Sequence, residues 1–194
     1  MSAGHQTGST VTTVPTRPSD IIAFWSEAGP SRWFTKDEAF DRRFRETFLD
    51  AHEAACRGDL DPWQRTPGGA LALILLLDQF PRNVFRGTPR MYASDAAALK
   101  VAETALAAGH DRHIDADLRL FLYLPFNHSE VLEDQERCVE LCRALGDPET
   151  LAFAVDHREI VKRFGRFPHR NPILGRETTS EERRFLDEGG FAGQ

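Results

Sequence analysis

The stretch ALALILLL, residues 70–77, decides the fold of this 194-residue chain because it is apolar at every position. Thr66 and Pro67 precede it, and a proline at the first helical position is typical of a helix start. A helix that is hydrophobic on every side has to be surrounded by other elements. We therefore expect residues 70–77 to form the central buried helix and Pro81 to end it.

The segments on both sides of this stretch also show helical spacing of their apolar residues, and none alternates in the way that indicates a β-strand. Two capping boxes are predicted, one from Thr35 and Glu38 and one from Asn127 and Glu130. The helices are expected between Ser19 and Glu27, Thr35 and Gly58, Thr66 and Pro81, Ser94 and Gly109, Asp115 and Pro125, and Asn127 and Leu145, then from Asp147 and from Ser180 onward.

The sequence thus predicts an all-α fold of stacked antiparallel helical hairpins with about seven to eight helices, because short loops make successive helices antiparallel. A single all-helical domain is expected over residues 19–194. Residues 1–18 are rich in Ser, Thr, Gly and Pro and lack the apolar residues that would offset the entropy of ordering them. We expect this segment to be a disordered tail.

The charge and composition of the chain argue against several classes of partner and cellular location. The formal net charge of −6 argues against general binding to nucleic acid or to acidic membranes. No stretch approaches the roughly 18 apolar residues that span a bilayer, and the first residues lack the apolar core of a secretory signal. The three cysteines form no paired disulfide framework. A cytoplasmic location is expected.

Residues 157–176, HREIVKRFGRFPHRNPILGR, carry six Arg or Lys residues and a single acid, a formal charge of +5. Two explanations stay open. Cations in the last turn of a helix interact favourably with its dipole, which explains Arg163 and Arg166. After Gly165, however, the chain is rich in proline, and a rigid loop would hold Arg170 in place to bind a carboxylate or phosphate through two hydrogen bonds.

Several other polar residues stand at positions where burial is expected. His128 and Glu130 could transfer a proton, although Glu130 has the alternative role of a capping residue. Residues around Pro81 could form either a ligand site or a cluster of caps and salt bridges, and His157 could be a ligand group or a satisfied core residue. The candidate catalytic residues are His128, Glu130 and His169; the candidate substrate-binding residues are Asp78, Arg82, Asn83, His157, Arg163, Arg166, Arg170, Asn171 and Arg176.

Motifs for other chemistries do not occur. There is no H-E-x-x-H or C-x-x-C for a metal ion, and no phosphate-binding loop, dinucleotide-binding glycine motif or G-x-S-x-G. We therefore expect neither a metal ion nor a cofactor.

The residues already singled out form short blocks: FW at 24–25, WF at 33–34, LDQFPRN at 77–83, RGT at 86–88, LPFNHSE at 124–130, and RFGRFPHRN at 163–171 followed by LGR at 174–176. In this order they resemble a bacterial all-helical family of domains of unknown function, number nine-two-four. The resemblance covers residues 20–191 and implies a helical fold similar to tetratricopeptide-repeat proteins, but no established reaction. Two blocks depart from the family, at Ser26 and at residues 177–180.

Two functional hypotheses follow. In the first, the protein is an enzyme or a specific binder of a small anionic molecule, a carboxylate or a phosphate, held by arginines with a histidine as the acid–base group. In the second, it is a non-enzymatic interaction module whose stacked helices bind a protein or a peptide carboxylate. Helix pairs of this kind often dimerise, so a homodimer stays open, whereas nucleic acid and membrane are not expected partners.

Overall fold

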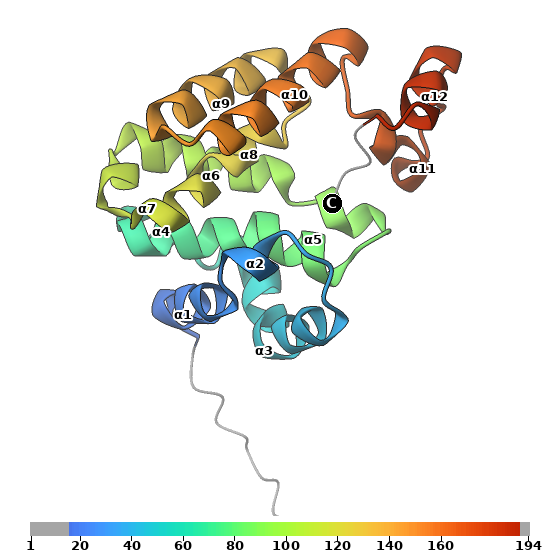
Figure 1. Ribbon diagram of the computed structural model, residues 1–194. Helices are drawn as coiled ribbons and strands as arrows, with labels where there is room; N and C mark the ends of the chain where they lie inside the picture. Colours follow the sequence, from blue (N-terminus) through green and yellow to red (C-terminus); the bar gives the residue numbers. More distant parts are fainter. Residues whose placement is uncertain (1–15, 191–194) are drawn as a thin grey trace, which may run out of the picture.

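The computed structural model describes residues 16–190, and this part of the chain is all-helical (Figure 1). The α-helices are α1 (Pro18–Ala28), α2 (Pro30–Trp33), α3 (Glu38–Cys56), α4 (Pro67–Ile74), α5 (Phe80–Val84), α6 (Asp95–Ala107), α7 (Ala116–Arg119), α8 (Leu124–Asn127), α9 (Leu132–Leu145), α10 (Pro148–Phe164), α11 (Asn171–Leu174) and α12 (Ser180–Asp187). Short turns join them: 3-10 segments η1 (Asp61–Arg65), η3 (Pro89–Tyr92), η4 (His110–His113), η5 (Leu120–Leu122) and η6 (Pro168–Arg170), and the π segment η2 (Leu75–Gln79).

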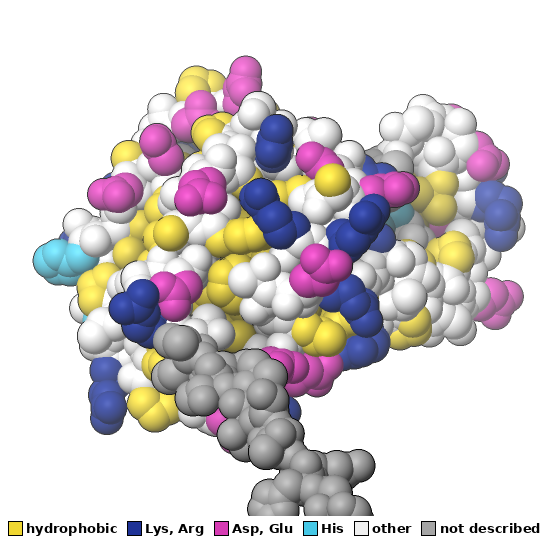
Figure 2. All heavy atoms as spheres, turned by 90° about the horizontal axis from the view of Figure 1, so that it is seen from below, with side chains coloured by type: hydrophobic (Ala, Val, Ile, Leu, Met, Phe, Trp, Pro, Cys, Tyr) yellow, Lys and Arg dark blue, Asp and Glu magenta, His cyan; other side chains and the backbone are white. Residues whose placement is uncertain are grey.

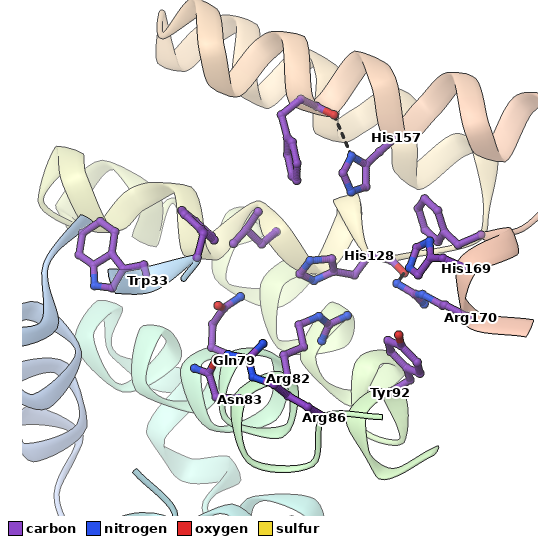
Figure 3. Close-up of a pocket in the computed structure, with 14 residues that line it drawn as sticks. Trp33, Gln79, Arg82, Asn83, Arg86, Tyr92, His128, His157, His169 and Arg170 are labelled. Atoms are coloured by element: carbon purple, nitrogen blue, oxygen red, sulfur yellow. Dashed lines mark hydrogen bonds between the residues drawn. The ribbon is translucent and has the colours of Figure 1, made fainter. Parts of the chain in front are cut away.

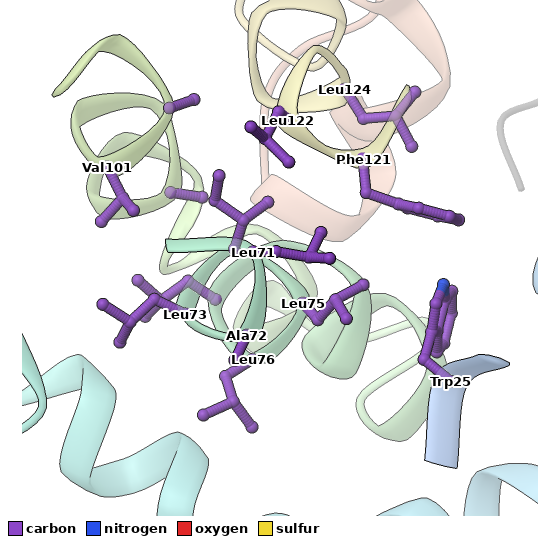
Figure 4. Packing of buried hydrophobic residues seen from close by; sticks show 14 of the residues in the cluster. Trp25, Leu71, Ala72, Leu73, Leu75, Leu76, Val101, Phe121, Leu122 and Leu124 are labelled. Atoms are coloured by element: carbon purple, nitrogen blue, oxygen red, sulfur yellow. The ribbon is translucent and has the colours of Figure 1, made fainter. Parts of the chain in front are cut away.

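The all-α prediction is confirmed, and the central stretch is buried as expected. Every residue from 70 to 77 is at most 2% exposed. Figure 4 shows apolar side chains leaving this helix in several directions toward Trp25, Val101, Phe121 and Leu122. The single apolar run is thus buried because neighbouring helices cover it on all sides.

The other helices are arranged in layers around α4 (Figure 1). Helices α1 and α3 lie on one side of it, and α6 and α8 lie on the other. The antiparallel pair of α9 and α10 packs beyond α8. Helices α11 and α12 stand at one end, where Phe167 belongs to a second small apolar cluster with Ile160 and Val161. This arrangement brings the end of the central helix close to α8 and α10.

Pro81 does not end the central helix, which corrects the prediction. The chain widens into the π segment η2 and continues as α5, with Pro81 in its first turn. The N–H of Phe80 bonds to the carbonyl of Leu75, five residues back. Proline has no N–H, so carbonyl groups one turn earlier need other donors. The side chains of His52, Ser94 and Arg82 donate to the carbonyls of residues 76, 77 and 78, at 2.8, 2.5 and 2.9 Å.

Two predicted capping boxes are also wrong. Helix α3 begins at Glu38, and its cap is Asp37, which accepts from the N–H groups of residues 39 and 40 at 3.0 Å. Helix α9 begins at Leu132 after Val131, so Glu130 is not in its first turn. Pro125 lies inside α8 rather than ending a helix. The number of separate α-helices therefore exceeds the seven to eight predicted, because the short helices α2, α5, α8 and α11 are additional.

Most of the predicted tail, residues 1–15, lies outside the described residues. Pro18 already belongs to α1, and the residue at its N-cap is Arg17 instead of Ser19. No helix in the described part of the chain is long and apolar enough to cross a membrane. On the face shown in Figure 2, acidic and basic side chains are interspersed, with hydrophobic side chains exposed between them.

Candidate functional site

A small cavity of about 70 Å³ lies where α5, the α8–α9 connection, α10 and the residues around η6 meet (Figure 3). Three guanidinium groups and three imidazole rings line it, and among its described lining residues there is no Asp or Glu. The polar lining residues are Gln79, Arg82, Asn83, Arg86, Tyr92, His128, His157, His169 and Arg170; the apolar ones are Trp33, Phe34, Leu124, Phe153 and Phe167.

Asp78 and His128 form a buried pair behind this wall. Nδ1 of His128 lies 2.7 Å from Oδ1 of Asp78, whose side chain is fully buried. Burial and the nearby Arg82 lower the pKa of His128 despite the opposing effect of Asp78. Burial alone would raise the pKa of Asp78, but Arg82 and His128 outweigh it and the pKa falls. The histidine is therefore neutral and donates Nδ1–H to the carboxylate, which leaves a lone pair on Nε2.

Arg82 connects this pair to α6. Its Nη1 lies 3.1 Å from Oδ1 of Asp78, and its guanidinium group donates to both oxygens of Asp95 at 2.8 and 3.0 Å. Gln79 Nε2 donates to Oδ2 of Asp78 at 2.7 Å. Two bonds in parallel to one carboxylate fix the plane of a guanidinium group. The π segment thus carries the carboxylate and the amide, and the arginine follows in α5; each is held by a charged or polar partner.

Arg170 and Arg86 complete the cationic part of the wall. Arg170 donates to Asp95 Oδ2 at 3.3 Å and to the carbonyl of His128 at 3.0 Å. The Arg170 guanidinium group also lies 4.5 Å from the centre of the Tyr92 ring, and its buried Nε has no hydrogen-bond partner among the described residues. Arg86 donates to Asp41 at 2.9 Å and to Asn83 at 2.7 Å. Each carboxylate lies behind its arginine and does not line the cavity.

The other two histidines of the cavity are also uncharged near neutral pH. Burial lowers the pKa of His157 to about 3, and its Nδ1 lies 2.8 Å from the carbonyl of Phe153, to which it donates. Burial and then the charge of Arg170 lower the pKa of His169 to about 4. A neutral imidazole has one donor nitrogen, which can bond to an anion, and one acceptor nitrogen, which can bond to a hydroxyl group or a water molecule. The positive charge of the cavity therefore comes from its arginines.

Five of the predicted site residues lie elsewhere, in a cluster that fastens α11 and α12. Glu130 accepts from Arg176 at 2.7 and 2.9 Å and from the N–H of Phe167 at 2.8 Å. Arg166 pairs with Glu182 at 2.6 Å, and Arg163 pairs with Glu181 at 2.9 Å. The side chain of Asn171 bonds to Arg176 at 2.9 Å. The structure therefore separates the predicted set into a cavity group (Arg82, Asn83, His128, His157, His169 and Arg170, with Asp78 behind them) and this cluster (Glu130, Arg163, Arg166, Asn171 and Arg176).

Sequence reasoning missed several residues of the site. Asp95 has the position of an ordinary acidic residue in the first turn of a helix, and nothing in the sequence pairs it with Arg82 or Arg170. Trp33 and Phe34 form one of the short blocks of the sequence but are not among the predicted site residues. Gln79 stands in the block LDQFPRN together with Asp78, Arg82 and Asn83, and Arg86 begins the next block, RGT, so proximity to predicted residues was the available signal.

Chemically, the site combines cationic donors with a neutral histidine that is held by a buried carboxylate. Guanidinium groups are suited to bind the planar oxygens of a carboxylate or phosphate. A histidine whose Nδ1–H is fixed by an aspartate can accept a proton at Nε2. The residues of the site can therefore bind an anion and accept a proton.

The chain is similar to a protein of known structure and matches a family profile. None of the curated proteins compared with the chain matches it. A solved structure of a protein of unknown function from Agrobacterium tumefaciens is similar, with 54% sequence identity and a TM-score of 0.86, over 89% of this chain and 97% of that one. The family profile described as bacterial protein of unknown function, DUF924, matches residues 21–190. With the match covering nearly all of the helical part of the chain, the protein belongs to this bacterial family of unknown function.

Proposed function

We propose that the cavity binds a small anionic molecule, a carboxylate or a phosphate, and that the protein acts on it as an enzyme or binds it specifically. The observation that carries the proposal is the lining: Arg82, Arg86 and Arg170 line the cavity, and no carboxylate among the described residues does. Asp78, Asp95 and Asp41 hold these arginines from behind. The donors are thus fixed before the ligand arrives, which reduces the entropy cost of binding.

His128 supplies the proton acceptor in this proposal. Its Nδ1–H is engaged with Asp78, so Nε2 takes a proton from a hydroxyl group or a water molecule beside the bound anion. His128 can accept this proton without a change of tautomer, because the bond to Asp78 already keeps the ring proton on Nδ1 and leaves Nε2 free of a proton. Asp78 acts through His128 and is a positioning residue.

Anion binding is tested by thermal unfolding and calorimetric titration with acetate and inorganic phosphate. A ligand at 100 times its Kd stabilises a protein by about 2.7 kcal/mol, and a domain of this size gains roughly 2–4 °C per kcal/mol. The wild-type protein should therefore gain several degrees with at least one of the two anions. Arg86→Gln should weaken that binding about tenfold or more, since a hydrogen bond to a charged group contributes roughly 1.5–3 kcal/mol.

Arg166→Gln is the matched control. Arg166 is as exposed as Arg86, at 28% against 26% of the side chain, and it also pairs with a carboxylate, but it lies outside the cavity. It should lower stability and leave anion affinity unchanged. Loss of binding in Arg166→Gln and not in Arg86→Gln would move the anion to the α11–α12 cluster. Binding of a peptide carboxylate, but of neither anion, would favour the interaction module instead.

The proton acceptor is tested by following the imidazole of His128 by NMR. A bound anion favours the protonated ring, so the pKa of His128 should rise from its lowered value when the ligand is present. His128→Asn keeps a donor near the position of Nδ1 but has no basic nitrogen. It should bind the anion without taking up the proton that calorimetry detects in the wild-type protein. An unchanged pKa in the saturated complex would contradict the assignment.

A further inference from the structure

A second cavity adjoins the first and has a different character. It measures about 280 Å³, and its wall includes Leu120, Cys138, Cys142 and Ala154. Phe34, Leu124 and Phe153 line both cavities, so the two lie next to each other at these three side chains. Charged and polar groups are few in this second cavity: Asn127, and Glu149 and Thr150 from the first turn of α10. A cationic cavity and a mainly apolar cavity therefore lie side by side.

Two of the three side chains that line both cavities are exposed to solvent. Phe34 is 45% exposed and Phe153 is 41% exposed, whereas most other phenylalanines of the described chain are buried. They come from different parts of the fold, since Phe34 directly follows α2 and Phe153 lies in α10. Large apolar groups that stay accessible beside a pocket are typical of ligand sites rather than of core packing. Covering them with an apolar group would remove this surface from water.

We infer that the ligand is an organic acid with an apolar tail of several carbons, its carboxylate at Arg82, Arg86 and Arg170 and its tail between Phe34 and Phe153 in the second cavity. This inference rests on the proposed anion site and specifies its ligand. The small first cavity has room for a compact charged group only. The larger second cavity has no cation among its described lining residues and would accept the hydrocarbon part.

The test is the dependence of affinity on chain length, measured by calorimetry with acetate, butanoate and hexanoate. Each methylene that leaves water contributes about 0.8 kcal/mol, which corresponds to roughly a three- to fourfold lower Kd. Hexanoate should therefore bind at least tenfold more tightly than butanoate. Hexanol, which has the same tail without the charge, should bind much more weakly than hexanoate.

Thr150→Trp places a large ring at the rim of the second cavity and should abolish the gain in affinity from butanoate to hexanoate, with acetate binding unchanged. Thr104→Trp makes the same substitution on an exposed turn of α6 that lines neither cavity, and should keep the gain. Circular dichroism checks that both variants fold. Leu120→Asn provides a second variant, since it makes the half-buried wall polar with a side chain of the same branching and should reduce the same gain.

The outcomes separate the two proposals. If acetate binds but affinity does not increase with chain length, the apolar tail is excluded and the anion site stands. If no acid of any length binds, the anion site itself fails. A chain-length gain that is equal in Thr150→Trp, Leu120→Asn and the wild-type protein would place the tail elsewhere and overturn the inference. Equal affinity for hexanol and hexanoate would overturn it as well, because the charged end would then contribute nothing.

Discussion

At the scale of single residues, Asp78 has the largest influence on the site. It is fully buried and contacts Arg82, His128 and Gln79. A buried carboxylate is costly to desolvate, and here its charge is offset by an arginine and by hydrogen bonds on both oxygens. Its position in the π segment is what holds it against His128, which comes from a connection 50 residues later.

Asp78→Asn should lower the free energy of unfolding by about 3 kcal/mol, the lower end of the range for breaking a buried pair, because Arg82 keeps Asp95 as a partner. Urea denaturation measures this change. The pKa of His128 should fall further, since Asp78 raises it in the wild-type protein. Asp59→Asn removes an exposed carboxylate paired with Arg57 and should cost less than about 1 kcal/mol. Equal costs would mean that the buried pair contributes little.

At the scale of elements, the π segment η2 explains how a proline can stand within the central helix. Helical geometry and Pro81 together leave carbonyl groups without their usual donors, and side chains from α3 and from the start of α6 reach them. Segments of this type often occur at functional sites, and this one carries Asp78 and Gln79. The irregular turn therefore has two consequences: it presents polar side chains and it depends on tertiary partners.

Ser94→Ala should cost about 1–3 kcal/mol, because it leaves the carbonyl of Leu77 without a donor in a buried place. Pro81→Ala restores an N–H near that carbonyl. The double variant should therefore be less destabilised than the sum of the two single changes, as measured in a double-mutant cycle. Ser26→Ala, on the exposed face of α1, is the control and should change stability by less than about 0.5 kcal/mol. Strict additivity would show that Ser94 does not replace the missing donor.

At the scale of the whole molecule, burial lowers the pKa values of His52, His128, His157 and His169. Each of these rings is protonated in the unfolded chain below about pH 6.5 but stays neutral in the folded protein to lower pH. The unfolded state then binds more protons, so stability increases with pH in this window and is lost as the pH falls. We expect the protein to be markedly less stable at pH 5 than at pH 7.

His157→Gln isolates one of these contributions. The wild-type ring titrates at about 3 when folded and near 6.5 when unfolded. Between pH 4 and 6 the free energy of unfolding of the variant should therefore increase less steeply with pH, by about 1.4 kcal/mol per pH unit, in urea-denaturation measurements. Val161→Ala, on the same helix, removes buried apolar volume and should lower stability at every pH without changing the slope. A slope unchanged by His157→Gln would contradict the pKa assignment.

The all-α class and most polar residues of the cavity could be predicted from the sequence. The run 70–77 and the absence of strand-like alternation were sufficient for the all-α class, because burial and periodicity are local properties of a sequence. Most of the polar residues that line the cavity were also identified, since they stand next to prolines and at helix ends. The role expected of Glu130 as a cap was wrong because Arg176 and the N–H of Phe167, both distant in sequence, bind its carboxylate instead.

The sequence by itself determined that the fold is all-α, which helix is buried, and that arginines are concentrated in residues 157–176. The loop expected after Gly165 was wrong, because η6 and α11 follow there. Only the tertiary structure decided which arginines face the cavity. Arg170 reaches it beside Arg82, whereas Arg163, Arg166 and Arg176 are held by Glu181, Glu182 and Glu130. The physical reason is that an ion pair depends on which charges the packed helices bring within a few ångströms, and most of these partners are many residues away along the chain.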